Sequence, residues 1–496
     1  MMTLTTLPDL QIQFGGAELS EPLLATLAAI EVNEALGRPA QCELTFIDPP
    51  LAEFGQQTIG SELAVVYAAT GDEVFAGTAT ALEVVHDSGG VTSVRVRAYS
   101  ALNDAGNAQV VRTFEDMTVG EIVETVLSEN GIFVEIDCDT TLRHHVTQFN
   151  ESDLELVNRL LAEEGVLLSS RGLLATVFAT DGGLREMEFL ELGLNLLEVS
   201  IEMNAVRATE SVATQSWSPV TGEAEGQEAT AGRVVHGLRS EDGAARVLSG
   251  VVSNDERHIA LAQSELDRRA AVDSIVAGTA EGSATLRPGV VVALEGVAAP
   301  FNESYVIATT SHTFDARGYL TSFTSEIPAT VAPAPGAVAS IGVVSAVDDP
   351  EMMGRVQVTY PAFGDIQSPW MLVALPGGSA AAGLTCLPSV GDTVIVLLPD
   401  GSPSHGVILG GLAAAPGFDD SGVDGDATMR YLLVTPGGHR VSLDDTAQSI
   451  RIDDVTGSFF EMTPDGVTLH AGVDLQIEAP GQNLVIAATA IDFRRL

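Results

Sequence analysis

The chain has 496 residues, of which 45% are hydrophobic, and 68 Asp and Glu against 23 basic residues give a formal net charge of −45. So apolar a composition excludes a disordered acidic tail, and the length predicts several domains. Binding to a phosphate backbone needs clustered cations, so the acidic charge spread along the chain argues against nucleic acid as a partner.

All 23 basic residues are Arg, and Lys, normally among the commonest residues, does not occur. Two explanations stay open. Salt adaptation is favoured, because at molar salt the Debye length falls to roughly 3 Å and screens the repulsion among the carboxylates. A GC-rich genome would also favour Arg over Lys.

The N-terminal segment has neither a basic region nor a continuous apolar stretch, so we expect no signal peptide and synthesis that ends in the cytoplasm. Every apolar run is interrupted before about 20 residues, which argues against a membrane-spanning helix. Cys42, Cys138 and Cys386 are odd in number, far apart and lack metal-binding spacing, so we expect buried free thiols and not a disulfide or zinc framework.

Short apolar runs separated by Gly-rich turns predict β-structure, a barrel or sandwich, up to about residue 100. Two helices should follow. The capping boxes Thr118-x-x-Glu121 and Ser152-x-x-Glu155 predict where they begin, and a glycine after each apolar stretch predicts where they end.

An internal repeat connects the first part of the chain to residues near 300. Phe75 to His86 aligns with Phe301 to His312 at the same spacing; each copy follows an apolar strand and precedes a Thr-Ser pair. One charged helix is expected near residues 255–271. The repeat predicts two related barrels.

Proline marks the next boundary, because Val331 to Gly336 reads as a stiff linker. Five short strands within residues 338–412 fit a small Greek-key barrel such as an OB-fold. An acidic, Gly-rich connector, 413–427, leads to the tail.

The tail carries seven pairs of apolar residues, each pair separated by one position, with turn-forming residues between pairs. Strand alternation places both members of a pair on one face, so a single chain forms a narrow ribbon with an uncovered apolar side. Three copies wound about one axis would bury these faces in a triangular β-prism. The expected trimer core of this needle is Leu443, Ile452, Met462, Leu469, Ile477, Ile486 and Phe493.

Several motifs resemble the VgrG-like spike and hub proteins of contractile injection systems, a family that includes phage baseplate hubs. Arg112 to Thr118 and Gln148 to Asp153, each followed by a helix, resemble its hub region. Gly354 to Val358 and Pro388 to Val394 resemble its OB-fold, and Thr435 to Asp445 resembles the start of its spike. The similarity covers nearly the whole chain.

The resemblance implies a mainly β, multi-domain protein with a small α+β part, tube-protein-like β-barrels, an OB-fold and a C-terminal trimeric triangular β-helix. The expected segments are a first hub β-barrel (1–110), an α+β hub insert (111–200), a second hub β-barrel with one helix (201–330), a linker (331–337), the OB-fold (338–413), a second linker (414–428) and the needle (429–496).

The implied role is structural and not enzymatic. The protein would adapt a sixfold tail tube to a threefold spike, puncture a target envelope and carry a tip protein or cargo, as part of a phage-tail-like particle or virion baseplate. The chain is expected to form a homotrimer. Its other expected partners are tail tube or hub-ring proteins, baseplate wedge proteins, a PAAR-like tip protein and, transiently, the target-cell envelope. No nucleic acid is expected as a partner. The tip protein would contact Ile491, Asp492, Phe493 and Leu496.

The common hydrolase and nucleotide-binding signatures are missing from the sequence, so we predict no catalytic, cofactor or metal site. For His144-His145, a place in a surface loop is favoured over metal ligation. For His470, an outward orientation on its strand is favoured over a metal site on the trimer axis. The alternative function is a secreted carbohydrate-binding or hydrolytic β-protein, monomeric and with a ligand cleft. Whether the machine is an extracellular injection system, a tailed virus or a type VI system stays open.

Overall fold

The computed structural model describes residues 10–55, 58–107, 109–180, 186–204, 209, 211–218, 223–230, 246–249, 255–271, 273–328, 336–377, 383–399, 401–412 and 420–494. The chain forms two compact units, residues 1–412 and 413–496. Strands outnumber helices in both, so the mainly β prediction is confirmed. Within the ranges described, no helix has the length and apolarity needed to cross a membrane.

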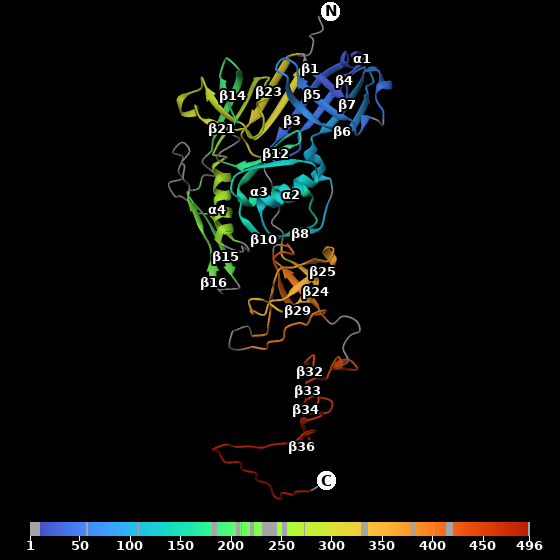
Figure 1. Ribbon diagram of the computed structural model, residues 1–496, viewed down its shortest axis with the longest axis vertical. Helices are drawn as coiled ribbons and strands as arrows, with labels where there is room; N and C mark the ends of the chain where they lie inside the picture. Colours follow the sequence, from blue (N-terminus) through green and yellow to red (C-terminus); the bar gives the residue numbers. More distant parts are fainter. Residues whose placement is uncertain are drawn as a thin grey trace, which may run out of the picture. The chain divides into compact units, whose positions relative to one another are not determined.

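One large sheet organises the first unit. Its strands are β1 (Leu10–Phe14), β2 (Ala17–Glu18), β3 (Leu27–Ala35), β4 (Gln41–Ile47), β5 (Glu62–Tyr67), β6 (Asp72–His86), β7 (Thr92–Tyr99), β14 (Leu196–Met203), β19 (Ser274–Glu281), β22 (Thr309–Asp315) and β23 (Gly318–Thr324). The order across these 11 strands is β14-β19-β23-β22-β3-β4-β7-β6-β5-β1-β2. Strands from near the N-terminus and from near residue 320 therefore lie side by side (Figure 1).

The two halves of this sheet repeat the same strand order. The series β14-β19-β23-β22 corresponds to β3-β4-β7-β6, and β22 pairs antiparallel with β3 to join the halves, with His312 opposite Val32. The repeat therefore runs head to tail. The sequence predicts two related barrels, but not that they share one sheet, because the joining strands come from opposite ends of the predicted hub.

The same side-chain contact occurs in both copies of the predicted repeat. His86 Nδ1 lies 2.9 Å from Thr92 Oγ1, and His312 Nδ1 lies 3.1 Å from Thr321 Oγ1. The segments beginning at Phe75 and Phe301 thus supply equivalent strands, as their alignment predicts.

A second correspondence becomes visible only through the strand pairing. Ile30-Glu31-Val32-Asn33 on β3 occupies the place that Ile201-Glu202-Met203-Asn204 holds on and just after β14. In each, the Asn amide donates to the Glu carboxylate two residues before it, at 2.9 and 3.3 Å. Four residues are too few to identify such a repeat from sequence alone.

A separate core lies between α2 (Val119–Glu129) and α3 (Asp153–Glu164) and the strands around them. Those strands are β8 (Arg112–Thr118), β9 (Phe133–Asp137), β10 (Leu142–Gln148), β11 (Val166–Arg171) and β12 (Leu174–Ala179). Both predicted capping boxes are formed, and Gly165 ends α3 in the left-handed conformation, with φ 72°. The apolar faces of both helices are buried in this core.

The two hub-like motifs of the sequence meet beside these helices. Arg112 lies opposite Gln148 in the β8–β10 pair and donates to Gln148 Oε1 and to Asp153 Oδ1, each at 2.7 Å. Gln148 and Asn130 also donate to the Asp153 carboxylate. Asp153 is therefore a buried carboxylate held by three donors, which explains the Arg, the Gln and the Asp of the motifs.

Smaller elements complete residues 10–328. They are α1 (Glu21–Leu24), the sheet of β13 (Met187–Glu191), β20 (Val291–Glu295) and β21 (Ser304–Val306), and the strands β15 (Ser211–Ser218), β16 (Glu223–Glu225), β17 (Glu228–Thr230) and β18 (Arg246–Ser249) beside α4 (Asp255–Ala270).

Residues 338–412 form a third core from β24 (Val338–Ala346), β25 (Gln357–Tyr360), β26 (Ile366–Gln367), β27 (Leu372–Val373), β28 (Thr393–Leu398) and β29 (Val407–Gly411). All five predicted strands are found. The carboxylate of Asp349 accepts hydrogen bonds from the Arg355 guanidinium and from the backbone N–H of Glu351, Met353 and Arg355, which holds its pKa well below its usual range.

The second unit contains β30 (Val423–Asp424), β31 (Ala427–Thr428) and a five-stranded antiparallel meander. The meander strands are β32 (Arg430–Val434), β33 (Arg440–Asp444), β34 (Ser449–Asp453), β35 (Phe459–Thr463) and β36 (Gly466–His470). Residues 471–494 follow without forming a strand. The predicted linkers lie partly outside the described residues, at 331–335 and 413–419.

Replacing Arg112 by Met should lower the free energy of unfolding of the first unit by about 3 kcal/mol, because it leaves a buried carboxylate without its charge partner. Arg317→Met is the matched control, since Arg317 is 73% exposed in its pair with Asp315 and its replacement should leave the free energy of unfolding nearly unchanged. Calorimetric unfolding of the full chain measures both. Equal, small effects would contradict the account of this network.

Candidate functional site

The meander of the second unit places its apolar residues on one face. Cross-strand partners form two ladders. One ladder is Leu433, Val441, Ile452, Phe460 and Leu469, and the other is Tyr431, Leu443, Ile450, Met462 and Val467. The pattern of alternating pairs predicted this arrangement for the four pairs between residues 441 and 469.

Within the second unit these ladders are largely open to solvent. Eight of the ten side chains are exposed, from 37% for Met462 to 66% for Val467, and Val441 and Phe460 are half-buried. A continuous apolar face of this kind on a soluble protein marks an interaction surface. Four expected needle-core residues, Leu443, Ile452, Met462 and Leu469, lie on it.

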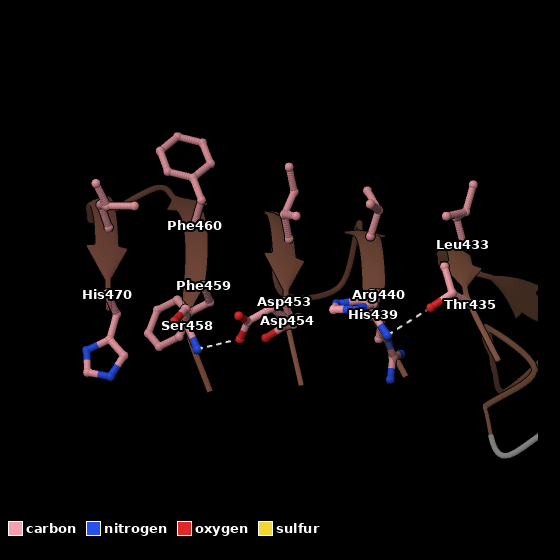
Figure 2. A pocket seen from close by; sticks show the side chains of 13 residues that line it. Leu433, Thr435, His439, Arg440, Asp453, Asp454, Ser458, Phe459, Phe460 and His470 are labelled. Atoms are coloured by element: carbon pink, nitrogen blue, oxygen red, sulfur yellow. Dashed lines mark hydrogen bonds between the residues drawn. The ribbon is translucent and has the colours of Figure 1, made fainter. Parts of the chain in front are cut away.

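The opposite face of the meander is polar and charged. Figure 2 shows Phe460 and Leu433 on one side of the strands and His470, Phe459 and Arg440 on the other. Arg451 pairs with Asp453 and Glu461, and its guanidinium lies 3.9 Å from the centre of the Phe459 ring, on which His470 stacks. His470 thus faces away from Leu469, as expected, and serves as a ring partner.

The remaining expected core residues lie in the segment that forms no strand. Ile477, Ile486 and Phe493 are 59%, 62% and 90% exposed. The expected tip residues Ile491, Asp492 and Phe493 are described there as well, with Asp492 accepting a hydrogen bond from Arg494 at 2.6 Å. Leu496 lies outside the described residues. The alternation near the C-terminus therefore does not produce strands within one chain.

Asp420, from the acidic connector, pairs with Arg430 and Arg440 at the start of the meander. Hydrogen bonds from Arg430 and from the backbone N–H of Gly422 hold the pKa of Asp420 well below its usual range. The Asp420 carboxylate is therefore already occupied by its ion pairs with Arg430 and Arg440. Among the described residues no group of three His, Cys, Asp or Glu side chains is arranged to hold a metal ion.

A second polar site lies where the core of α2 and α3 meets residues 338–412, and we call it the hub–OB junction. Ser404 Oγ donates to Thr147 Oγ1 at 2.9 Å in a buried contact, and the rings of Phe149 and Phe363 lie 4.9 Å apart. His144 and His145 are on β10 and not in a surface loop, and they face opposite ways. His144 is 67% exposed, whereas His145 is 8% exposed and faces the junction.

Burial, and to a smaller extent the neighbouring His405, lower the pKa of His145 to about 4. The nearest carboxylate of β8 is Glu115, whose Oε1 lies 3.8 Å from His145 Nδ1. The other charged or titratable groups around this imidazole are Arg143 on β10, Arg159 and Glu163 on α3, Arg257 on α4 and His405 in the OB segment. The folded junction therefore favours the neutral form of the His145 imidazole.

Acid should weaken this junction. Because the folded pKa of His145 lies below the value near 6.5 of a free imidazole, its contribution is complete above pH 6.5 and is lost as the pH falls toward 4, by about 1 kcal/mol at pH 5.5. His145→Gln should flatten the pH dependence of the unfolding temperature in this interval, whereas His144→Gln should leave it unchanged. Identical pH profiles for wild type and His145→Gln would contradict this.

Two family models match the sequence. The phage tail baseplate hub (GPD) family matches residues 33–318, and the type VI secretion system/phage-baseplate injector OB domain matches residues 340–412. The second match confirms the predicted OB-fold. No curated protein matches the sequence.

Solved structures share the fold. The E. coli c3393 protein, described as a component of the type VI secretion system with structural similarity to the T4 bacteriophage tail proteins gp27 and gp5, is 16% identical, with 81% of this chain and 99% of that chain covered and a TM-score of 0.55. In the lidded Francisella PdpA–VgrG complex the matching chain is 9% identical, with coverages of 94% and 80% and a TM-score of 0.58.

These matches agree in order with the structure, since the hub model spans the 11-stranded sheet from β3 to the β22–β23 turn and the OB model covers the third core. They do not favour a secreted carbohydrate-binding or hydrolytic protein. The chain belongs to the phage tail baseplate hub family, the hub and VgrG-like spike proteins of phage and type VI injection systems.

Proposed function

We propose that three copies of this chain form the hub and spike of a contractile injection machine, adapting a sixfold tail tube to a threefold spike that punctures the target envelope. The observation that carries the proposal is the uncovered apolar face of the meander. Nothing else in the second unit covers its ladders, whose large side chains are 37% exposed or more at most positions. Two further copies supply matching faces and would close a triangular prism.

The segment after the meander supports the same assembly. Residues 471–494 contain three of the alternating apolar pairs, yet no strand partner within the described chain. Unpaired backbone groups and exposed apolar pairs together call for partner strands. Strands from the other copies would provide both the hydrogen bonds and the cover.

The head-to-tail sheet supports the change of symmetry. Head-to-tail interfaces form rings when the rotation closes. One end of the repeat is β14, and at the other the outer edge of β6 has no partner strand from Thr80 to His86 among the described residues. The β22–β3 contact already shows how one repeat joins the next, so three chains would present six equivalent repeats to a sixfold tube.

A trimeric prism would suit axial load, because sliding one strand past another exposes apolar surface worth about 25 cal/mol per Å². We propose the needle core as Leu443, Ile452, Met462, Leu469, Ile477, Ile486 and Phe493, and a tip-protein contact at Ile491, Asp492, Phe493 and Leu496. The seven-segment division of the chain is part of the same proposal.

The proposed partners are the other two chains, tail tube or hub-ring proteins, wedge proteins, a PAAR-like tip protein and, transiently, the target envelope. One relative is described in complex with PdpA, which supports a hub that binds other components. The proposed role is mechanical and not enzymatic. The place of action is an assembled injection particle.

Ile452→Asp should break the trimer, because each copy would bring a carboxylate into the dry core at a cost of several kcal/mol. Ser442→Asp is the matched control, since Ser442 lies on the charged face opposite Arg451. Light scattering in molar KCl should give about three times 51.6 kDa for wild type and the control, and 51.6 kDa for Ile452→Asp. A wild-type mass of 51.6 kDa would overturn the proposal.

Low salt should loosen the assembly if the Lys-free composition is salt adaptation. Three chains bring 3 × −45 = −135 formal charges together, and this repulsion is screened only at high ionic strength. Dialysis from molar KCl into dilute buffer should therefore lower the unfolding temperature and the trimer fraction. Unchanged values would favour the genome-composition explanation.

A further inference from the structure

A small cavity of about 150 Å³ lies at the hub–OB junction. Strand β10, helices α3 and α4, and the OB segment all contribute to its wall. The basic and imidazole residues that line it are Arg143, Arg159, Arg257, His145 and His405, with the backbone of His144 beside them and its side chain on the other face of β10. Glu163 is the one carboxylate among the described residues that line it. In a chain with a net charge of −45, three arginines beside one carboxylate are an unusual concentration of positive charge.

Arg143 is the central group of this cavity. Its side chain is 5% exposed, and its Nη2 lies 2.6 Å from Glu164 Oε1 and 3.3 Å from Glu163 Oε2. Its Nε and Nη1 are buried and donate to no acceptor among the described residues. Burial and the nearby Arg257 lower the pKa of the Arg143 guanidinium, but an arginine remains charged. Two charged N–H donors are thus left without acceptors.

The neighbouring carboxylates are already shared. Glu163 contacts Arg143, Arg159 and Arg257, and Glu151 is held by Arg159. No further side-chain acceptor from the described residues reaches the two free Arg143 donors. A buried donor without an acceptor costs about 1–3 kcal/mol, and more when it is charged.

We propose that this cavity binds a small tetrahedral oxyanion of the phosphate or sulfate class, which bridges the hub and the OB domain. Arginine guanidinium groups recognise such oxygens with paired N–H donors. On the OB side, Ser402, Ser404 and His405 offer hydroxyl and imidazole groups to the same ion. The volume admits an isolated ion and not a nucleotide. The site lies within one chain and does not depend on the trimer.

A bound ion would link the stability of the junction to the protonation of His145. A bound anion favours the protonated imidazole of His145, so it should offset the acid weakening of the junction. An occupied site would thus keep hub and OB domain together at a pH where the empty site loosens them. This distinguishes the ion from an ordered water, which carries no charge.

The test is thermal unfolding of the full-length protein at constant ionic strength, with potassium phosphate or sulfate replacing KCl, at pH 7 and pH 5.5. In wild type the unfolding temperature of the first unit should rise and saturate with oxyanion, and rise more at pH 5.5. In Arg143→Met the apparent affinity should fall at least tenfold. Arg317→Met, on an exposed pair, should retain the wild-type response.

A non-saturating rise shared by wild type and Arg143→Met would reflect general exclusion of kosmotropic salts and would overturn the proposal. Crystals of wild type soaked in potassium selenate give a second readout, which does not depend on the folding of Arg143→Met. Anomalous density within hydrogen-bond distance of Arg143 Nε or Nη1 supports the site. Its absence there, or chloride alone in the cavity, contradicts an oxyanion site.

Discussion

The second unit depends on one constraint: its five-stranded meander exposes an apolar face that no other described part of that unit covers. Five short strands pair well enough to fix the register, and the register fixes both ladders on the same side. A two-layer arrangement is the usual way to bury such a face, and this unit has only one layer. In the proposed trimer the other two copies would supply the missing layer, and assembly would then be part of folding and not a later event.

In the hub, the two repeats are joined by backbone hydrogen bonds and not by an apolar face. Its two repeats join through β22 and β3 into one sheet, so the interface between repeats is a row of strand hydrogen bonds. Glu34 adds to this contact by approaching His312 Nε2 at 3.4 Å. In the proposed spike, axial force would pass through the hub–OB junction, where a buried hydroxyl pair, an aromatic pair and a basic cavity lie between the two parts of the first unit.

Local signals in the sequence predicted local structure well. Thr118 and Ser152 cap their helices as expected because a capping box involves only four consecutive residues. The alternation between residues 441 and 469 predicted the needle face because a strand's period of two needs no distant partner. The repeat at Phe75 and Phe301 was recognisable because its His and Thr make the same contact in both copies.

Long-range features of the structure could not be predicted from the sequence. The β22–β3 pairing, the cavity around Arg143 and the burial of His145 join segments from distant parts of the chain, and nothing near any one of these residues indicates its partner. The strands expected around Ile477 and Ile486 failed to form for another reason. Alternation predicts which side chains share a face, but not whether the hydrogen-bonding partner belongs to the same chain.

The most direct test of the central claim is a cryo-electron microscopy map of the full-length protein in molar KCl. The account predicts a threefold axis through the needle, with Ile452 and Leu469 from three chains facing it and residues 471–494 paired with strands of the other copies. A single chain whose ladders are covered by its own hub or OB segment, with no threefold axis, would contradict it.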